Sequence, residues 1–501
     1  MGFETKSGKE GRGGPLLSRA LNRLVLLHTN DLHSCFENMP KLAAAIRRFR
    51  AVVPPEQLLV VDCGDHMDRM RSETEGTEGV ANVQVLNAIG CEAFLPGNNE
   101  GLTFTRPQLE RMFSAAEFAV LGTNLADRTG HRPPWLKRTL VVEKAGRKIG
   151  LVGVTAPYND FYGPLGWHAE DPLEAAASAV RELRGEADLI VVLSHVGLRF
   201  DRELAGCVPG IDIIVGGHTH HLLEEAERAG SVLIGGAGKF GTHLGVMEIT
   251  FAEGERRPVD MRGYAIRVEG EADDEQVAAL IGRARLAGRR ALDRPAAVLR
   301  EPLGHDPLAE SELGNLLADG LRKWTGSEIG LVNAGQLLGG LAGGIRSEYD
   351  LLSVCPSPVN PCSLLVSGRD ILEALEQSLE ESHARKEIRG YGFRGKMLGT
   401  LCASGMTIWY DAAGEARRRI VEVRVGRKPL EPDRLYKVGT VDMFTFGAGY
   451  PSLGRGAELE YFLPGFLRDV LRKQLADRQA VRLSKIPRFI PAARRKPASD
   501  P

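Results

Sequence analysis

Long apolar runs and an excess of charge of either sign are both missing from this chain of 501 residues. No run approaches the ~20 consecutive apolar residues that a membrane-spanning helix needs. The formal net charge is −1, so the chain has no basic excess of the kind that nucleic-acid-binding proteins carry. The composition therefore predicts neither a membrane nor a nucleic acid as a partner, and it says nothing of the oligomeric state.

Paired cysteines are missing as well. The seven cysteines are scattered, odd in number and without a Cys-x-x-Cys pair. Residues 1–20 are polar and rich in glycine, and they contain no apolar stretch long enough for a signal peptide. This usage is typical of reduced thiols and not of a disulfide framework, so we expect a cytoplasmic protein.

Apolar runs of strand length are present between residues 24 and 251, where they alternate with segments of helical pattern. The strand-like runs are Leu24–Leu27, Leu58–Val61, Ile149–Val154, Leu189–Leu193, Ile211–Val215, Val232–Ile234 and Leu244–Phe251. The helical segments include Met39–Phe49, Val80–Ile89 and Pro172–Arg184. Because the strand-like runs lack polar alternation, they are typical of strands buried on both faces. The pattern predicts a layered α/β domain with two packed sheets at residues 21–268.

A second domain is expected, because 501 residues are more than a single hydrophobic core ordinarily accommodates. The segment from Glu271 to Arg294 has an acidic start and amphipathic spacing, which predicts a linker helix at residues 269–295. Helical and strand patterns continue at 313–324, 329–332, 364–367, 369–381, 401–410, 420–425 and 436–441. We predict a smaller α+β domain at residues 296–488, with a disordered N-terminus (1–20) and a disordered basic tail (489–501).

Residues of metal-binding type follow successive strand-like runs. They lie in six short blocks: Asp31-Leu32-His33, Gly64-Asp65, Gly97-Asn98-Asn99-Glu100, Ser194-His195, His218 and His220. In α/β sheets, ligands gather in the crevice beyond the carboxyl ends of the strands. Two Asp, one Asn and four His are the donors that two divalent ions need, and the mixture suits Mn²⁺, Fe²⁺, Co²⁺ or Zn²⁺ better than Ca²⁺.

The spacing within the blocks suits two ions about 3.5–4 Å apart. Asp65 follows a glycine in a tight turn and can offer one oxygen to each ion, so it is the natural bridge. Asp31 and His33 are two residues apart on one loop, and both can therefore face one ion. His218 and His220 have the same spacing, so their imidazoles can be directed to different ions.

The order of these blocks resembles the calcineurin-like metallophosphoesterases. The chain from Leu24 to Pro487 is similar to the bacterial 5′-nucleotidase/UDP-sugar hydrolase family, whose own motifs resemble Leu27-His28-Thr29-Asn30-Asp31-Leu32-His33 and Gly216-Gly217-His218-Thr219-His220. The resemblance implies a metallophosphoesterase domain followed by a C-terminal nucleotide-binding domain. It also implies two ligand sets that share one carboxylate: Asp31, His33, Asp65 and His220 for one ion, and Asp65, Asn98, His195 and His218 for the other.

The third block departs from the family pattern Gly-Asn-His-(Glu/Asp), in which a later Asp orients the His. This chain has Asn99 in place of the His, and it lacks the orienting Asp. Asn99 can donate a hydrogen bond to a phosphoryl oxygen, but it cannot deliver a proton, and such general acid help is worth about 10²–10⁴-fold. We expect a shift toward better leaving groups, or a substitute acid, for which His66 beside Asp65 is the nearest candidate.

The C-terminal domain resembles the family in shorter segments. Asn333 and Arg346 are similar to the ends of the family's Asn-Gly-Gly-Gly-Ile-Arg segment, and the arginine is the implied clamp of a phosphate. The family holds the base between two aromatic rings, but Asp442 stands at the nominal position of one ring, and Ala448 replaces an expected Asp. The candidates for substrate contacts are Asn333, Arg346, Phe444, Phe446 and Tyr450, with Tyr391 or Phe393 as a second ring.

The combined interpretation is a dinuclear-metal hydrolase of nucleotide catabolism that releases phosphate from nucleotides, with a metal-activated water as nucleophile. Two alternatives stay open. The missing acid favours a phosphodiesterase or pyrophosphatase that acts on nucleotide-sugars, dinucleotides or cyclic nucleotides. The combined departures at positions 99, 442 and 448 favour a catalytically weak protein that binds metal and nucleotide.

Overall fold

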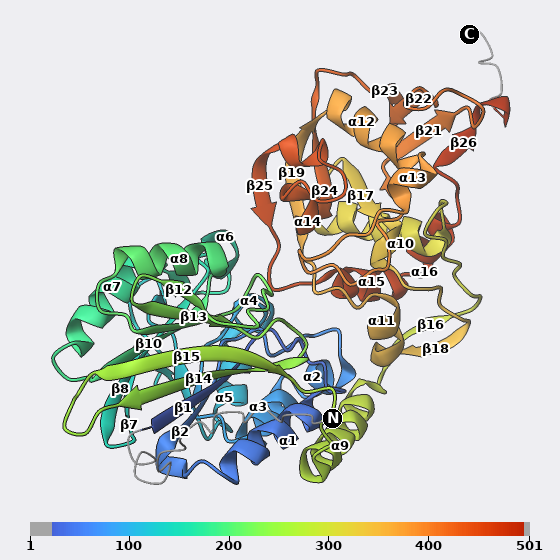
Figure 1. The fold of residues 1–501 in the computed structure, drawn as a ribbon. Coiled ribbons are helices and arrows are strands. Elements are labelled where there is room, and N and C mark those ends of the chain that lie inside the picture. The colour runs from blue at the N-terminus through green and yellow to red at the C-terminus, as the bar shows by residue number, and fades with distance from the viewer. Residues whose placement is uncertain (1–22, 495–501) are drawn as a thin grey trace, which may run out of the picture.

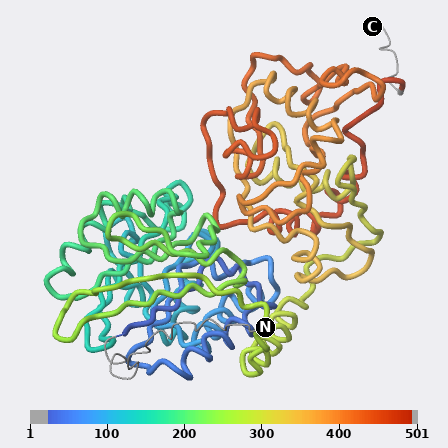
Figure 2. Tube along the Cα trace, viewed as in Figure 1, coloured from blue at the N-terminus to red at the C-terminus, as the bar shows by residue number. Residues whose placement is uncertain are grey.

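The computed structural model describes residues 23–494, which form two units joined by one long helix (Figure 1). The first unit spans β1 to β15, and the second unit spans β16 to β26. Helix α9 (Glu275–Leu292) lies between them and packs against α1, α2 and α3 of the first unit. The tube in Figure 2 shows the same division, with the blue-to-green and the yellow-to-red halves of the chain in separate lobes. The predicted disorder at residues 1–20 lies outside the described residues.

Two sheets packed face to face form the first unit. The seven-stranded sheet has the order β15 (Pro258–Arg267), β14 (His243–Phe251), β1 (Arg23–Thr29), β2 (Leu58–Asp62), β3 (Ala93–Phe94), β4 (Ala119–Leu121), β6 (Leu136–Lys137). The six-stranded sheet has the order β12 (Glu227–Ala229), β13 (Val232–Gly236), β11 (Ile213–Gly216), β10 (Leu189–His195), β8 (Arg147–Thr155), β7 (Thr139–Lys144). Leu26 of β1, Val61 of β2 and Val191 of β10 meet in the core between the sheets. The predicted two-sheet α/β architecture is confirmed.

Helices cover the outer face of each sheet. Against the seven-stranded sheet lie α1 (Met39–Arg50), α3 (Val80–Ala88) and α5 (Arg106–Phe113), and against the six-stranded sheet lie α7 (Pro172–Leu183) and α8 (Leu198–Cys207). The shorter helices are α2 (Ser72–Gly76), α4 (Asn98–Thr103) and α6 (Asn159–Tyr162), and β5 (Leu125–Ala126) pairs with β9 (His168–Ala169). The central strands β1, β2, β10 and β11 are thus buried on both faces, which explains why they lack polar alternation.

Strands β1, β2 and β3 pair in parallel, as do β8, β10 and β11. Parallel pairing places the carboxyl ends of neighbouring strands at one edge of each sheet. The segments after β1, β2, β3, β10 and β11 carry all six polar blocks. The topology therefore gathers residues that are far apart in the sequence.

The second unit is an α+β domain, as predicted. Its main sheet has the order β20 (Leu401–Ser404), β17 (Ile329–Asn333), β24 (Leu435–Val441), β19 (Pro361–Ser367), β25 (Ala457–Tyr461). A second sheet has the order β23 (Lys428–Pro429), β22 (Ile420–Val425), β21 (Met406–Tyr410), β26 (Phe489–Pro491), and β16 (Pro295–Leu299) pairs with β18 (Gly344–Ser347). The helices are α10 (Glu312–Trp324), α11 (Glu348–Val354), α12 (Gly368–Ser378), α13 (Glu381–Ala384), α14 (Asp442–Thr445), α15 (Leu467–Leu475) and α16 (Arg478–Ser484).

The β-rich stretch 401–410 forms two strands in different sheets, because Gly405 has a φ of +78° and turns the chain between them. One prediction for the second unit differs from the structure. The tail does not lose its structure at residue 489, because Phe489–Pro491 pairs in parallel with β21. The remainder of the predicted tail, residues 495–501, lies outside the described residues. Within residues 23–494, no helix has both the length and the apolar composition to cross a membrane.

Candidate metal centre

The seven residues proposed as metal ligands converge at the carboxyl ends of five strands. Asp31 and His33 follow β1, Asp65 follows β2, and Asn98 begins α4 after β3. His195 is the last residue of β10, and His218 and His220 follow β11. Asp31, Asp65 and His195 are almost fully buried. The site thus lies where the two sheets meet, on loops that tightly packed strands hold in place.

The backbone is left-handed at most of these positions. Positive φ angles occur at Asp31 (51°), His33 (46°), Asp65 (50°), His218 (73°) and His220 (58°). A non-glycine residue in this region costs of order 1–3 kcal/mol and persists only where the surroundings fix it. Here the Asp31 amide donates to the Gly64 carbonyl at 2.9 Å, and the His33 amide donates to the Asp65 carbonyl at 2.8 Å. The fold therefore holds strained turns that direct polar side chains inward.

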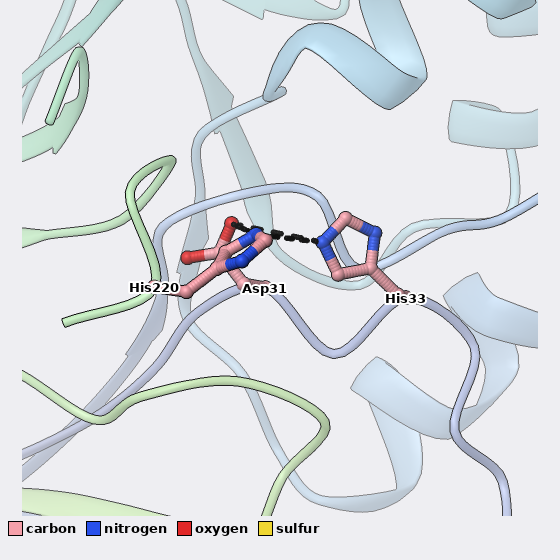
Figure 3. Close-up of side chains that lie close together, drawn as sticks. All are labelled: Asp31, His33 and His220. Atoms are coloured by element: carbon pink, nitrogen blue, oxygen red, sulfur yellow. Dashed lines mark hydrogen bonds and ion pairs between the residues drawn. The ribbon is translucent and has the colours of Figure 1, made fainter. Parts of the chain in front are cut away.

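One group of donor atoms surrounds Asp31 (Figure 3). The Nε2 atoms of His33 and His220 lie 3.1 Å apart, and they are 3.9 and 3.4 Å from Asp31 Oδ1. Asp65 Oδ2 lies 4.0 Å from His33 Nε2. Two imidazole nitrogens and two carboxylate oxygens thus point toward one small volume.

A second group of donor atoms lies on the other side of Asp65. Its Oδ1 is 3.3 Å from His195 Nε2, which is itself 3.3 Å from Asn98 Oδ1. His218 Nδ1 lies 2.8 Å from the same Asn98 oxygen. Asp65 therefore directs one carboxylate oxygen to each group, as a bridging ligand requires.

Hydrogen bonds behind these donors fix their orientation. His195 Nδ1 lies 2.7 Å from the Cys63 carbonyl and donates its hydrogen to that oxygen. The lone pair of Nε2 is therefore free to bind a metal ion. The buried Glu100 carboxylate accepts hydrogen bonds from three backbone amides, those of Asp65 at 3.0 Å, Met67 at 2.8 Å and Gly97 at 2.8 Å. The loops that carry Asp65 and Asn98 are thus fastened to one side chain.

The donor set fits divalent metal ions. Four imidazoles, two carboxylates and one amide oxygen are the chemistry that Mn²⁺, Fe²⁺, Co²⁺ and Zn²⁺ accept. Burial lowers the pKa of His195, but the Asp65 carboxylate outweighs burial and raises that pKa to about 10. A divalent ion at this position would therefore replace a proton on His195. Such a positively charged ion would also stabilise the neighbouring buried carboxylates.

Asn99 does not reach into the space between the two donor groups. Its Nδ2 donates to the Met67 carbonyl at 2.7 Å and lies 3.0 Å from His33 Nδ1. Its backbone amide donates to Asp65 Oδ1 at 2.7 Å. The predicted hydrogen bond from this amide to a phosphoryl oxygen is replaced by contacts that hold two of the proposed ligands.

His66 cannot be the substitute acid that the sequence suggested. Its side chain is fully buried, and its Nδ1 lies 3.2 Å from the Asn82 amide nitrogen, away from solvent. Burial lowers its pKa to about 3, so the ring is neutral at physiological pH. Adjacency to Asp65 in the sequence does not bring the His66 ring to the donor groups, because the ring packs beside Asn82 instead.

Three of the five predicted substrate-binding residues are core residues. The Asn333 side chain donates to the Leu398 carbonyl at 2.6 Å and accepts from Gln336 at 3.1 Å. Phe444 and Tyr450 are fully buried and pack against each other, with 5.5 Å between ring centroids. These predictions were wrong, because the side chains that resemble family motifs are used inside the second unit.

Arg346 lies on a different part of the second unit. It belongs to β18, which pairs with β16 directly after the linker helix, and its ion pair is with Asp350 at 3.8 Å. No described contact joins it to the donor groups or to the aromatic rings near them. Phe393 is also buried. The structure gives neither side chain a place in a substrate site.

Phe446 and Tyr391 are the predicted contacts that remain available. The Phe446 ring is 48% exposed and stacks on Tyr391, with centroids 5.8 Å apart, and on Phe161 of the first unit, with centroids 6.0 Å apart. Phe161 also packs against Tyr461, with 4.3 Å between the ring centroids. These four rings, here called the aromatic cluster, lie across the boundary between the two units.

The sequence interpretation missed Tyr158, Phe161 and Arg394. Tyr158 Oη lies 2.9 Å from His218 Nε2, and Arg394 of the second unit forms an ion pair with the buried Asp68 at 2.7 Å. None of the three lies in a recognisable motif. Tyr158 and Phe161 belong to the first unit, and only Arg394 is brought to the centre by the packing of the two units.

Comparison with known proteins agrees with this geometry. Residues 24–222 match the family described as calcineurin-like phosphoesterase, and residues 296–455 match the 5′-nucleotidase C-terminal domain. A relative from Bacillus subtilis (strain 168), described as uncharacterized metallophosphoesterase YunD, is 36% identical over 459 residues, which cover 91% of this chain and 99% of the relative.

Solved structures share the fold. The 5′-nucleotidase precursor from Thermus thermophilus aligns with a TM-score of 0.58 at 24% identity, over 94% of this chain and 99% of its own. The NAD nucleotidase of Haemophilus influenzae aligns with a TM-score of 0.64 at 16% identity, over 94% of this chain and 97% of its own. The similarity to these structures is one of fold, and it covers both units.

Proposed function

We propose that this chain releases phosphate from nucleotides with the help of two divalent ions. The premise is that the chain belongs to the calcineurin-like phosphoesterases that carry a 5′-nucleotidase C-terminal domain, a family of metal-dependent phosphoester hydrolases. The main observation behind the proposal is that the two carboxylate oxygens of Asp65 face different donor groups, Oδ2 toward His33 and Oδ1 toward His195. When bound, the ions would activate a water as nucleophile and offset the negative charge of the phosphoryl group.

The residues of the chain have distinct roles in this proposal. Asp31, His33 and His220 hold one ion, Asn98, His195 and His218 hold the other, and Asp65 joins them. Asn99 keeps Asp65 in position through its backbone amide, and its side chain, which donates to the Met67 carbonyl, packs against His33. The second unit contributes Phe446 and Tyr391, whose exposed rings offer a stacking surface for a nucleobase. The substrate then lies between the two units, close to both.

A second candidate is a pyrophosphatase or phosphodiesterase. The observation that favours it is the occupied Asn99 amide, which leaves no proton-donating imidazole at this position. A pyrophosphate or aryl leaving group needs protonation less than a nucleoside alkoxide does. The solved Haemophilus influenzae protein, which is described as an NAD nucleotidase, shares the fold.

One assay distinguishes the two candidates. Purified protein with Mn²⁺ or Co²⁺ is given AMP, UDP-glucose or bis-p-nitrophenyl phosphate, and the products are separated by chromatography. The nucleotidase proposal expects AMP to be converted to adenosine and phosphate at a rate at least equal to that of UDP-glucose. Faster cleavage of UDP-glucose and the diester would favour the second candidate. The Asp65→Asn variant is the control for metal-dependent turnover, and no turnover of any substrate by the metal-loaded wild type would overturn both.

A further inference from the structure

Tyr158 stands between the metal centre and the aromatic cluster. Its hydroxyl oxygen lies 2.9 Å from His218 Nε2, and the two rings are 5.9 Å apart. Tyr158 is the residue directly before α6, and Phe161 of that same helix stacks on Phe446 of the second unit. A ligand that contacted both the donor groups and the stacked rings would lie close to this hydroxyl.

The hydrogen of the Tyr158 hydroxyl is available for such a ligand. His218 directs Nδ1 toward Asn98 Oδ1 in the second donor group, so this nitrogen is the one that offers a lone pair to an ion. Nε2 then carries the ring hydrogen and donates it to Tyr158 Oη. Among residues 23–494, His218 is the only hydrogen-bond partner of this hydroxyl. Its own O–H is thus left to point into the site.

The other polar groups near the third block are already occupied. The Asn99 amide is bonded to Met67 and lies against His33, and His66 is buried beside Asn82. Arg394 reaches the centre from the second unit, where it is held on the Asp68 side by its Nε, which donates to Asp68 at 2.7 Å, and by its Nη1, which donates to the Phe393 carbonyl at 3.1 Å. Tyr158 is the partly exposed donor that the first unit presents on the side of the aromatic cluster.

We propose that the Tyr158 hydroxyl donates a hydrogen bond to the leaving-group oxygen of the substrate, the atom that joins the phosphorus to the nucleoside. The inference rests on the proposed phosphate-ester hydrolysis. Water attacks phosphorus, the P–O bond to the leaving group breaks, and its electron pair stays on the leaving oxygen. The hydrogen bond from Tyr158 stabilises that oxygen, which takes up a proton released by the attacking water, so Tyr158 keeps its own hydrogen.

The test compares two leaving groups in the variant Tyr158→Phe, loaded with Mn²⁺. Loss of one donor aimed at developing charge costs about 10²-fold in kcat. We expect this loss with a nucleoside 5′-monophosphate, whose alkoxide needs the hydrogen bond. With p-nitrophenyl phosphate, whose aryl oxide is already stabilised, we expect a change of less than about threefold. The matched control is Tyr162→Phe, which removes a hydroxyl from the same helix inside the core and should change neither rate.

Leaving-group dependence separates this role from simple support of His218. Tyr158→Phe also removes the acceptor of the His218 Nε2 hydrogen, so Mn²⁺ binding, measured by calorimetry, should weaken by up to about 10–100-fold, and both rates are therefore compared at saturating Mn²⁺. Equal loss of rate on both substrates at saturating Mn²⁺ would overturn the inference and leave Tyr158 as a positioning residue. Absence of hydrolysis of either ester by the metal-loaded wild type would instead reject the proposed function, and the inference with it.

Discussion

The Asn99 amide nitrogen lies 3.0 Å from Nδ1 of His33, at the position where the family pattern has a catalytic imidazole. The same nitrogen donates to the Met67 carbonyl at 2.7 Å, so the amide joins the loop after β2 to a proposed metal ligand. An asparagine that is fastened in this way supports the site and does not take part in proton transfer. We therefore propose a positioning role for Asn99.

The variant Asn99→Ala should therefore weaken metal binding more than it weakens the fold. Loss of a partner that orients a metal-binding histidine costs about 10–100-fold in metal affinity. We expect that decrease in a Mn²⁺ titration followed by calorimetry. The matched control is Asn87→Ala, because the Asn87 side chain also makes two hydrogen bonds, to Ala115 and Glu117, but lies far from the centre. Equal Mn²⁺ affinity in wild type and Asn99→Ala would contradict the positioning role.

The metal content should follow the division of the donors into two groups. Wild-type protein is expected to retain two ions per chain after dialysis, measured by plasma mass spectrometry. His220 belongs to the first group alone, so His220→Ala should retain one ion, whereas Asp65→Ala should lose both. His221→Ala is the control, since within residues 23–494 its exposed ring bonds only to Thr219. One ion per wild-type chain under Mn²⁺ saturation would rule out a dinuclear centre.

Phe446 should determine affinity for the base and not the chemical step. Its ring stacks on Tyr391 and Phe161, and base–aromatic stacking is worth about 1–3 kcal/mol. In Phe446→Ala, the KM for AMP is therefore expected to rise about tenfold or more while kcat changes little. Phe446→Tyr keeps the stacking ring and should behave as wild type. Steady-state kinetics with glycerol phosphate, which has no base, provide the reference, and an equal rise of KM for both esters would be evidence against a stacking role.

The metal-binding region was accessible to sequence reasoning because its signals are local. Each proposed ligand follows an apolar run, and parallel strands bring their carboxyl ends together regardless of the distance along the chain. Asp31 and Asp65 lie within a few residues of the strands that position them. The two-sheet architecture followed from the same runs, since strands buried on both faces lack polar alternation.

The substrate side was not accessible in the same way. Asn333 and Tyr450 match family motifs in sequence, but burial decides their use, and both make their hydrogen bonds within the second unit. The residues that do face the centre, Tyr158 and Phe161, lie directly before and within α6, a helix of four residues without a motif. Tyr158 reaches His218 through the folding of the first unit, whereas Phe161 meets Phe446 only through the packing of the two units, which leaves no periodic pattern in the sequence.

Glu75 of α2 joins the two units through a buried ion pair. It lies 3.0 Å from Arg468 of α15 and 2.6 Å from Arg69. Burial raises the pKa of this carboxyl, but Arg468 and Arg69 outweigh burial and lower it from 4.5 to about 2. A carboxyl with a lowered folded-state pKa stabilises the fold above its unfolded pKa, and this contribution disappears as the pH falls from about 4.5 to about 2. The shift corresponds to about 3 kcal/mol at most.

The free energy of unfolding should therefore decrease between pH 5 and pH 3 in wild type and decrease less steeply in Glu75→Gln. Urea unfolding at several pH values measures both slopes. At pH 7 the variant should lose roughly 3–5 kcal/mol, because two buried arginines keep their charge without the carboxylate. Glu78→Gln is the control, since its ion pair with Arg111 is exposed and should contribute less than about 1 kcal/mol. Parallel pH profiles in wild type and Glu75→Gln would show that the pair does not stabilise the boundary between the units, and the position of the aromatic cluster would then need another explanation.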